Sequence, residues 1–153
     1  ARFDARAKTY RYRVWNGDVL SPFEARYAWH APAPRLDVAA MDAAARHFEG
    51  RHDFAAFQAS GGTARSTERT IVTSRVRTAD GVQGGAAALV VYDVHGQGFL
   101  RHMVRTIVGT LVEVGRGRRP PDWAADVIGS RERARTGQTA PAHGLCLVRV
   151  DYE

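Results

Sequence analysis

Hydrophobic and polar residues change their spacing several times along this chain, and each change predicts an element of secondary structure. Residues 9–15 alternate with a period of two, which is typical of a half-buried strand. Asp37 precedes apolar residues at helical spacing and Gly50 follows them, which predicts an N-cap and a helix ending near Phe48. Further strands are predicted at residues 70–76, 88–94 and 144–152, with a turn near residues 79–81.

The longest amphipathic pattern covers residues 98–115. At about 100° per residue its apolar side chains fall on one wide arc, with Arg101 and Arg105 outside it. This predicts a single helix in which these two arginines, four residues apart, lie one above the other. The glycines at 96 and 98 would let another group approach the start of the helix closely. The pattern therefore indicates an arginine held rigidly at a site.

The remaining segments complete an α+β pattern. Residues 22–34 read as a long connection, and Phe54 and Phe57 as a short helical turn. Pro120 and Pro121 open another predicted helix that ends near residue 128, whereas residues 131–139 are polar and predicted to be mobile. Strands separated by helices in this order predict one domain, residues 1–153, with a mostly antiparallel sheet and helices packed on one face.

Composition and charge narrow the class of partner only slightly. The 153 residues carry a net charge of +6, and Lys8 is the only lysine. Arginine's planar fork suits phosphates and RNA bases, although a GC-rich genome would explain the same bias. Cys146 is the only cysteine, which excludes an intrachain disulfide and agrees with a reducing cytoplasm. No apolar run reaches the roughly 20 residues of a membrane helix, so no membrane partner is expected.

Five separated motifs carry a family resemblance. They are Ala-Lys-Thr-Tyr-Arg-Tyr-Arg at 7–13, Gly-Arg-His-Asp-Phe-x-x-Phe at 50–57, Arg-Thr-Ile at 69–71, Gly-Phe-Leu-x-x-Met-Val-Arg-x-Ile-Val-Gly-Thr-Leu at 98–111, and Thr-Ala-Pro-x-His-Gly-Leu-x-Leu at 139–147. In this order the chain closely resembles the TruA-type tRNA pseudouridine synthases. One such motif alone would be weak evidence, but five spread from end to end are specific.

The resemblance implies a protein made of two similar α/β halves, whose sheets join edge to edge around an RNA cleft. This chain corresponds to the second half, and its start at Ala1 without a methionine suggests an excised domain. The family's nucleophilic aspartate lies in an Arg-Thr-Asp-x-Gly-Val-His motif of the first half, which is absent here. Residues 77–81 look only superficially similar, so Asp80 is read as a turn residue. Alone, the chain is expected to bind RNA weakly and to catalyse nothing.

For the whole protein, the resemblance implies a cytoplasmic homodimer that converts uridine to pseudouridine in the anticodon stem-loop of tRNA, without a metal or an organic cofactor. Arg105 matches the arginine that pairs with the nucleophilic aspartate, where a guanidinium would keep the carboxylate charged. Pairing with Glu113 or solvent is the alternative. Tyr10 matches the tyrosine that stacks on the target base. A packing role like that of Tyr12 stays open, because residues two apart on a strand share a face.

Several basic residues are candidates for RNA contacts, although a solvated surface is the default reading of such charges. Arg101 and His102 flank the polar side of the predicted helix, and His143 precedes the final strand. The other candidates are Arg11, Arg13, Arg65, Arg69, Arg116, Arg118 and Arg119.

Two other classes of protein remain open. The first is a non-catalytic RNA-binding domain, which would show salt-sensitive binding and need no other half. The second is a small-molecule α/β enzyme that holds a phosphate at the turn of residues 96–98. That turn lacks the third glycine of a dinucleotide fingerprint and the Gly-Lys-Ser/Thr of a phosphate loop, which disfavours this class.

Overall fold

The computed structural model describes residues 5–19, 22, 25–59, 66–79 and 89–152, and within them the chain forms one sheet covered on one side. Neighbouring strands follow the order β2-β1-β5-β4-β3, and β6 also pairs with β1. All pairs are antiparallel except β1 with β2. The strands are β1 (Ala5–Trp15), β2 (Trp29–His30), β3 (Gly50–Asp53), β4 (Glu68–Thr78), β5 (Leu89–Gly96) and β6 (Leu145–Tyr152).

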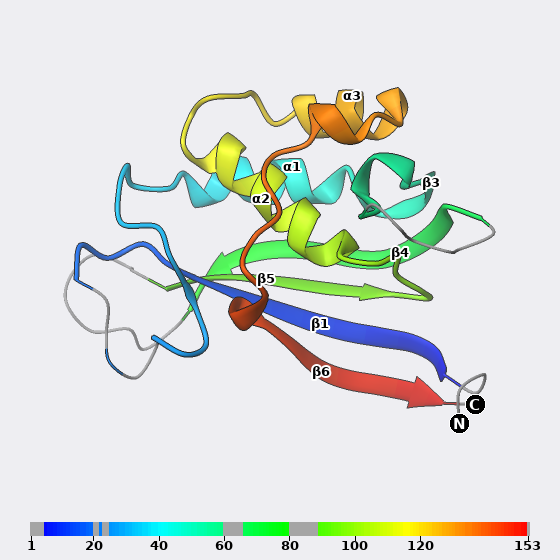
Figure 1. The fold of residues 1–153 in the computed structure, drawn as a ribbon, viewed down its shortest axis with the longest axis horizontal. Helices are drawn as coiled ribbons and strands as arrows, with labels where there is room; N and C mark the ends of the chain where they lie inside the picture. Colours follow the sequence, from blue (N-terminus) through cyan, green and yellow to red (C-terminus); the bar gives the residue numbers. More distant parts are fainter. Residues whose placement is uncertain (1–4, 20–21, 23–24, 60–65, 80–88, 153) are drawn as a thin grey trace.

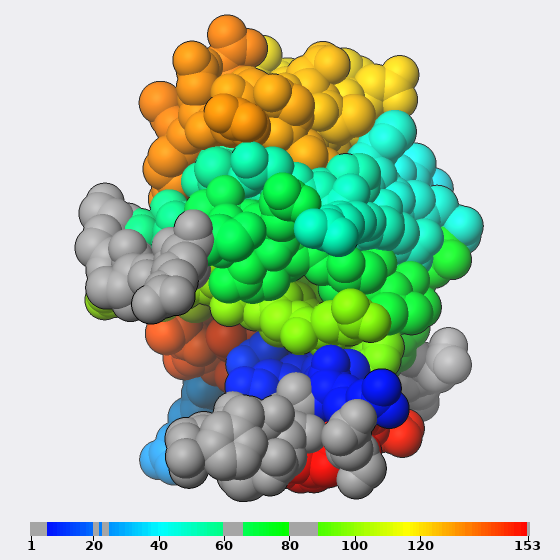
Figure 2. Space-filling view, turned by 90° about the vertical axis from the view of Figure 1, so that its right-hand side faces the viewer, coloured from blue at the N-terminus to red at the C-terminus, as the bar shows by residue number. Residues whose placement is uncertain are grey.

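Helices α1 (Val38–Arg46), α2 (Met103–Gly115) and α3 (Trp123–Ser130) lie on the same face of this sheet (Figure 1). Seen from the side, α3 lies at one end of the stack and β1 and β6 at the other (Figure 2). The expected α+β architecture, a mostly antiparallel sheet with helices on one face, is therefore confirmed. Among the described residues, no helix combines the length and apolarity needed to cross a membrane.

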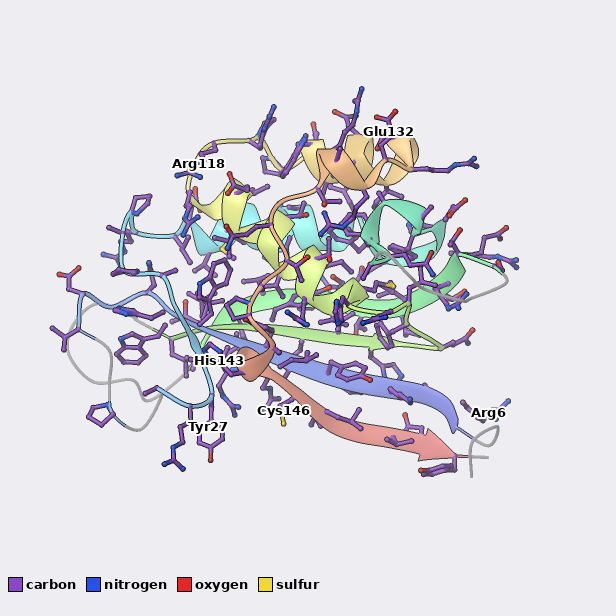
Figure 3. All side chains as sticks on the ribbon, in the orientation of Figure 1. Arg6, Tyr27, Arg118, Glu132, His143 and Cys146 are labelled. Atoms are coloured by element: carbon purple, nitrogen blue, oxygen red, sulfur yellow. The ribbon has the colours of Figure 1, made fainter. Side chains whose placement is uncertain are left out.

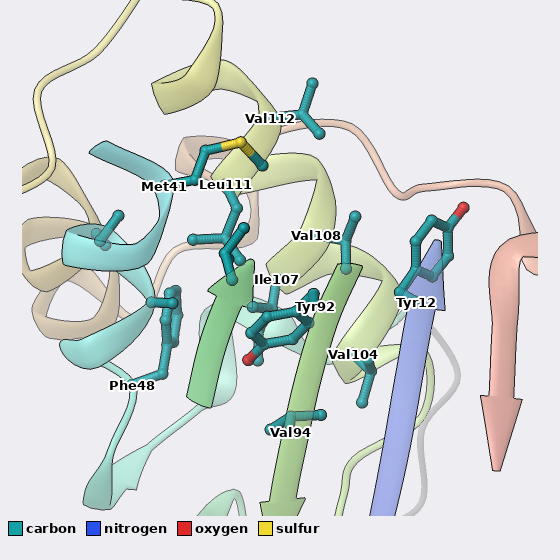
Figure 4. Packing of buried hydrophobic residues seen from close by; sticks show 14 of the residues in the cluster. Tyr12, Met41, Phe48, Tyr92, Val94, Val104, Ile107, Val108, Leu111 and Val112 are labelled. Carbon is teal, nitrogen blue, oxygen red and sulfur yellow. The ribbon is translucent and has the colours of Figure 1, made fainter. Parts of the chain in front are cut away.

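The core lies between α2 and the helix-facing side of the strands. Alternation along β1 buries Tyr12 and Val14 and sends Arg11 and Arg13 to the opposite face. Tyr92 and Val94 of β5 lie on the same side of the sheet as Tyr12, beneath α2, whose apolar residues occupy a wide arc (Figure 4). The most deeply buried side chains of α2 include Met103, Ile107, Val108, Leu111 and Val112.

Helix α1 is capped as the sequence predicts, and it also protects the sheet. The Asp37 side chain accepts a hydrogen bond from the amide of Ala40 at 3.0 Å. Farther along, the carboxylates of Asp42 and Glu49 accept the amides of Val76 and Ser74, both at 2.9 Å. These side chains satisfy part of the β4 edge beyond its pairing with β3, which would otherwise expose backbone donors.

The prediction of one helix from residue 98 is wrong at its beginning. Helix α2 begins at Met103, and His102 before it has a left-handed backbone with φ 59°. The chain must first turn out of β5, and Leu100 is buried in the core on the way. The carbonyl of Arg101 accepts a hydrogen bond from the amide of Ala59 at 3.1 Å, outside the helix. Arg101 therefore does not stack above Arg105.

Residues 131–139 are more structured than their polarity suggested. Residues Arg133–Arg135 form a short 3-10 helix, and residues 136–141, here called the strap, then run across α2 toward β6 (Figure 1). Gly109 has no side chain to keep the strap away, and a Cβ there would overlap the carbonyl of Gln138. The amide of Gly137 donates to the buried hydroxyl of Thr110 at 3.1 Å. Small residues thus allow backbone to pack directly on backbone.

Candidate active site and RNA-binding residues

The structure distinguishes Tyr10 from Tyr12 by burial, which the alternation of the sequence could not do. Tyr12 is fully buried, whereas Tyr10 lies half-buried at the margin of the core. On β1, Tyr10 is paired with Val94 of β5 and Leu147 of β6. Its ring meets the ring of Phe99 edge to face, with centroids 5.1 Å apart and planes at 88°. Tyr10 is therefore an aromatic side chain held in place with access to solvent.

A hollow of about 280 Å³ opens beside this tyrosine. Its walls combine the aromatic rings of Tyr10 and Phe99 with the cationic side chains of Lys8 and Arg69. Planar apolar walls next to positive charge suit a ligand that carries both a flat ring and a phosphate. The other lining residues are Ala7, Gln97 and Gly98.

The glycines before α2 shape this hollow, as their position in the sequence suggested. A Cβ at Gly96 would lie 2.9 Å from the carbonyl oxygen of Thr70 and 3.2 Å from the Phe99 ring. A Cβ at Gly98 would lie 3.3 Å from Cδ of Arg69. The groups that approach closely are therefore β4 and the Phe99 ring, and the absence of side chains at both glycines leaves them room.

Arg105, in the first turn of α2, is tied to the strap by two hydrogen bonds. Its Nε donates to the carbonyl of Ala140 at 2.8 Å, and the amide of Ala140 donates to the carbonyl of Arg105 at 3.0 Å. Glu113, the partner that the sequence left open, pairs instead with Arg118 at 3.2 Å. Within the described ranges, no carboxylate lies at ion-pair distance from Arg105. Its guanidinium is fixed at Nε and half-exposed.

Tyr12 lies close enough to Arg105 for the two groups to interact electrostatically. Its hydroxyl donates to the carbonyl of Pro141 at 2.5 Å, one residue beyond the carbonyl that Arg105 binds. Burial raises the pKa of Tyr12 well above its ordinary value, and the Arg105 charge opposes that shift. Tyr12 is therefore a neutral hydrogen-bond donor at physiological pH.

His102 and Arg101 lie where β5 leads into α2. Desolvation, followed by the positive charges of Arg105 and Arg101, lowers the pKa of His102 below its usual value. The imidazole is consequently neutral at physiological pH and adds no charge for a phosphate. Arg101 is exposed, and its guanidinium is the charged group of this pair.

Two of the candidate RNA-binding arginines, Arg11 and Arg13, lie on the face of the sheet opposite Tyr10. Nε of Arg11 donates to the Asp93 carboxylate at 2.7 Å, and the same carboxylate also pairs with Arg77 at 3.2 Å. Arg69, by contrast, lines the hollow, although its NH1 also donates to the carbonyls of Ser66 and Glu68. Arg65 and Asp80 lie outside the described residues.

The basic residues after α2 lie at the far end of the helix from Arg105: Arg116 is its C-cap, roughly 16 Å along the axis at 1.5 Å per residue. Arg116 is 17% exposed, lies over the ring of Trp29 at 5.9 Å and pairs with Glu113. Arg118 is exposed and also pairs with Glu113, and Arg119 lies 5.3 Å over the ring of Trp123. Of the three, Arg118 and Arg119 present their side chains to solvent, whereas Arg116 packs.

His143 is exposed at the 3-10 turn Ala142–Gly144 that precedes β6. Its Nε2 donates to the carbonyl of Ala28 at 3.0 Å, and this hydrogen bond links the segment before β2 to the turn before β6. Figure 3 shows His143 at that junction, near Tyr27. This contact of His143 is structural. His143 follows the strap and belongs to the same 3-10 turn as Gly144, which packs against the Tyr12 ring.

Sequence reasoning missed several residues that shape the site. Phe99 was treated as part of a helix, yet its ring forms one wall of the hollow. Lys8 and Gln97 line the same hollow; Lys8 belongs to the motif at 7–13 and Gln97 to the glycine turn at 96–98, but neither was singled out as a site residue. The carbonyl of Ala140 fixes Arg105 through its backbone, and a backbone contact leaves no mark on residue type.

A ring-lined hollow with two cations is the kind of site that can hold a nucleotide, and the helix-covered side of the same sheet carries an arginine fixed by the backbone. Comparison with known proteins agrees. The sequence model of one family, described as tRNA pseudouridine synthase, matches residues 44–153, and the chain belongs to that family.

Curated relatives extend the match to nearly the whole chain. A protein named tRNA pseudouridine synthase A from Pelobacter propionicus is 47% identical over 149 residues, which is 97% of this chain and 58% of the relative. Proteins of the same name from Solibacter usitatus and Myxococcus xanthus are each 49% identical, over 99% and 97% of this chain. The chain spans 53–58% of the length of these three relatives.

Proposed function

We propose that the protein containing this chain is a tRNA pseudouridine synthase, which isomerises uridine to pseudouridine in the anticodon stem-loop of tRNA. The observation that carries the proposal is the ring of Tyr10 at a cationic hollow, on the side of the sheet where α2 carries an arginine fixed to the strap. Relatives that bear this name, at 47% and 49% identity, support the reaction. This chain would supply the C-terminal part of the site, as one domain of residues 1–153.

Arg105 is proposed to hold the nucleophilic carboxylate in its charged form. An aspartate from the rest of the protein would approach the terminal nitrogens, because Nε is already bound to Ala140. A guanidinium beside a carboxylate lowers the carboxylate's pKa and orients it through paired hydrogen bonds. Fixing Nε beforehand reduces the freedom that Arg105 must lose when the pair forms.

Tyr10 is proposed to stack on the target uracil after that base has left the helix stack. The edge-to-face contact with Phe99 holds the phenol ring upright at the hollow. Lys8 and Arg69 would neutralise the phosphates of the flipped nucleotide, and Arg101, His102 and the surface arginines would contact neighbouring RNA. Base extrusion costs a few kcal/mol, and stacking offsets roughly 1–3 kcal/mol of that cost.

The outer edge of β6 is proposed as the joint with the other half of the protein. Among the described strands, β6 pairs with β1 alone, so its other edge offers unpaired backbone groups. Leu147 and Val148 are 47% and 46% exposed there. Since about two fifths of the length of the Pelobacter propionicus relative lies outside the match, a partner strand from the remaining sequence fits this edge. The resemblance further implies a cytoplasmic homodimer without a metal or an organic cofactor.

The test is turnover of unmodified tRNA, followed by tritium release from C5-labelled uridine. The whole protein is expected to turn over and the present chain alone is not, because the proposed nucleophile lies elsewhere. Arg105→Ala in the whole protein should abolish turnover while tRNA affinity changes little. If affinity fell together with activity, Arg105 would be a binding residue. Salt-sensitive binding without any turnover by the whole protein would favour a non-catalytic RNA-binding domain.

A further inference from the structure

The hydroxyl of Tyr12 has no part in the proposed chemistry, yet it reaches the same backbone segment as Arg105. Tyr12 lies on β1 with no exposed surface, and its hydroxyl donates to the carbonyl of Pro141 at 2.5 Å. The preceding carbonyl, that of Ala140, accepts from Nε of Arg105 at 2.8 Å. Two consecutive carbonyls are thus bound by two side chains, one from the sheet and one from α2.

The packing around Tyr12 leaves its ring little freedom. A Cβ at Gly144 would lie 2.5 Å from Cζ and 2.8 Å from the hydroxyl oxygen of Tyr12, so the final turn is closed down on the ring. Leu145, one residue later, is paired with Tyr12 across β1 and β6. The hydroxyl position is therefore set by the sheet, and a regular strand places a side chain more precisely than a loop does.

The strap is held against α2 upstream of Ala140, whereas at Pro141 the only side-chain hydrogen bond among the described residues comes from Tyr12, just before the 3-10 turn Ala142–Gly144. Gly137 and Thr110 fix the strap's first half, and the amide of Ala140 bonds to α2. Proline has no amide hydrogen, so the Pro141 residue can be hydrogen-bonded only through its carbonyl. Removal of the Tyr12 hydroxyl would take away that carbonyl's side-chain donor, the link between the strap's end and the sheet at this point, and allow the end of the strap to shift.

We propose that Tyr12 is a positioning residue for Arg105, which acts through the consecutive carbonyls of Pro141 and Ala140. The hydroxyl fixes the strap, the strap fixes the acceptor of Nε, and that acceptor sets the direction of the terminal nitrogens. The proposal rests on the proposed function, since an aligned guanidinium matters for rate only if it meets a nucleophile. A misplacement of about 1 Å at a catalytic group can cost on the order of a hundredfold in rate.

The experiment compares Tyr12→Phe with Tyr92→Phe in the whole protein. Tyr92 is the matched control, because its ring is also buried and its hydroxyl shares a hydrogen bond of 2.7 Å with Ser74, at the β4 side of the core. Tyr12→Phe is expected to lower kcat at least about tenfold while KM and tRNA affinity stay within about twofold. Tyr92→Phe is expected to leave kcat unchanged.

A second readout does not need the reaction. With 15N-labelled arginine, the Nε proton of Arg105 is expected to exchange slowly with water, and Tyr12→Phe should accelerate that exchange at least about tenfold, as for an opened hydrogen bond. Tyr92→Phe should not change it. If the whole protein proved inactive on tRNA, the proposed function would fail while this exchange still tested the positioning.

Rescue separates positioning from general loss of stability. Replacement of Tyr12 by p-aminophenylalanine keeps a hydrogen-bond donor at the same place on the ring. This variant is expected to restore kcat and the slow exchange of the Arg105 Nε proton, even if Tyr12→Phe folds poorly. Unchanged kcat and unchanged exchange in Tyr12→Phe would overturn the proposal. Equal losses of kcat in Tyr12→Phe and Tyr92→Phe, or no rescue by the amino variant, would also overturn it.

Discussion

The rings of Tyr10 and Phe99 meet edge to face, with centroids 5.1 Å apart and planes at 88°. Tyr10 belongs to β1, whereas Phe99 lies in the segment between β5 and α2. The pair therefore joins the strand that carries the proposed stacking residue to the segment that leads to Arg105. Since Gly96 leaves the space that the Phe99 ring occupies, the contact depends on a glycine as well as on two aromatic residues.

Replacement of Phe99 tests this pair without reference to function. Phe99→Ala is expected to lower the free energy of unfolding by about 2 kcal/mol, because a half-buried ring and its aromatic contact are lost. Phe99→Leu keeps apolar volume and should cost about 1 kcal/mol. Urea unfolding of the whole protein measures both. A loss below about 0.5 kcal/mol for Phe99→Ala would mean that the ring is not packed there.

Much of the fold could be predicted because it follows from local patterns. Alternation marked β1, strands were also predicted near β4, β5 and β6, and Asp37 marked the start of α1, since these patterns and caps are written in consecutive residues. The start of α2 could not be predicted in this way. Its apolar arc continued through Phe99 and Leu100, but those residues pack on Tyr10 and in the core before the helix begins. Tertiary contacts overrode a helical period.

The site was predictable only where side chains carry it. The motifs pointed to Tyr10 and Arg105, and these roles remain predictions. What holds Arg105 is the carbonyl of Ala140, and what seats the strap is the contact of Gly109 with the carbonyl of Gln138. Neither involves a side chain with a distinctive chemistry. The two-residue strand β2 had likewise no period to reveal it.

The packing of the strap on α2 can be tested by substitutions at two glycines. Gly109→Ala would place a methyl group where it overlaps the carbonyl oxygen of Gln138. The substitution is expected to destabilise the protein by at least about 3 kcal/mol. Gly129→Ala is the control, because a Cβ there meets nothing within 4 Å in α3. It should stabilise by about 0.5 kcal/mol through helix propensity. Thermal unfolding compares them, and equal effects would contradict the strap's packing.

The backbone of His102 gives a third test. With φ 59°, its left-handed conformation costs an L-residue about 1–2 kcal/mol but costs glycine little. His102→Gly should therefore change the free energy of unfolding by less than about 1 kcal/mol, because relief of strain offsets the entropy of the unfolded glycine. His102→Val should lose about 2 kcal/mol, since a branched side chain disfavours this conformation further. Equal stability of the two variants would indicate an ordinary helical φ.

Asp53 gives the fold a predictable dependence on pH. The hydroxyl of Thr67 donates to its carboxylate at 2.6 Å, and this bond, followed by the amide of Ala55 and the charge of Arg131, lowers the pKa of Asp53. A carboxylate whose folded pKa is lowered adds stability above its unfolded pKa, and that stability is lost as pH falls through the folded pKa. Thr67→Val should therefore cost about 1 kcal/mol at neutral pH.

The difference between Thr67→Val and the unchanged protein should shrink below about pH 4, where the carboxyl becomes protonated in the unfolded chain and then in the folded protein. Urea unfolding at a series of pH values measures it. A difference that stayed constant into acid would show that Thr67 acts through packing instead of through the charge of Asp53.

Salt dependence of tRNA binding can distinguish the two faces of the sheet. Arg101 is exposed in the segment between the hollow and α2, whereas Arg11 lies on the opposite face with Nε 2.7 Å from the Asp93 carboxylate. A phosphate contact releases about one counterion, so Arg101→Gln should reduce the slope of log K against log salt by about 1. Arg11→Gln should leave the slope unchanged, because Arg11 lies on the face away from the hollow and its Nε is already bound to Asp93. Since both variants remove one positive charge, net charge cannot explain a difference between them. Equal reductions of the slope by the two variants would mean that RNA also contacts the face of the sheet without helices. The hollow beside Tyr10 would then not be the only surface that RNA contacts.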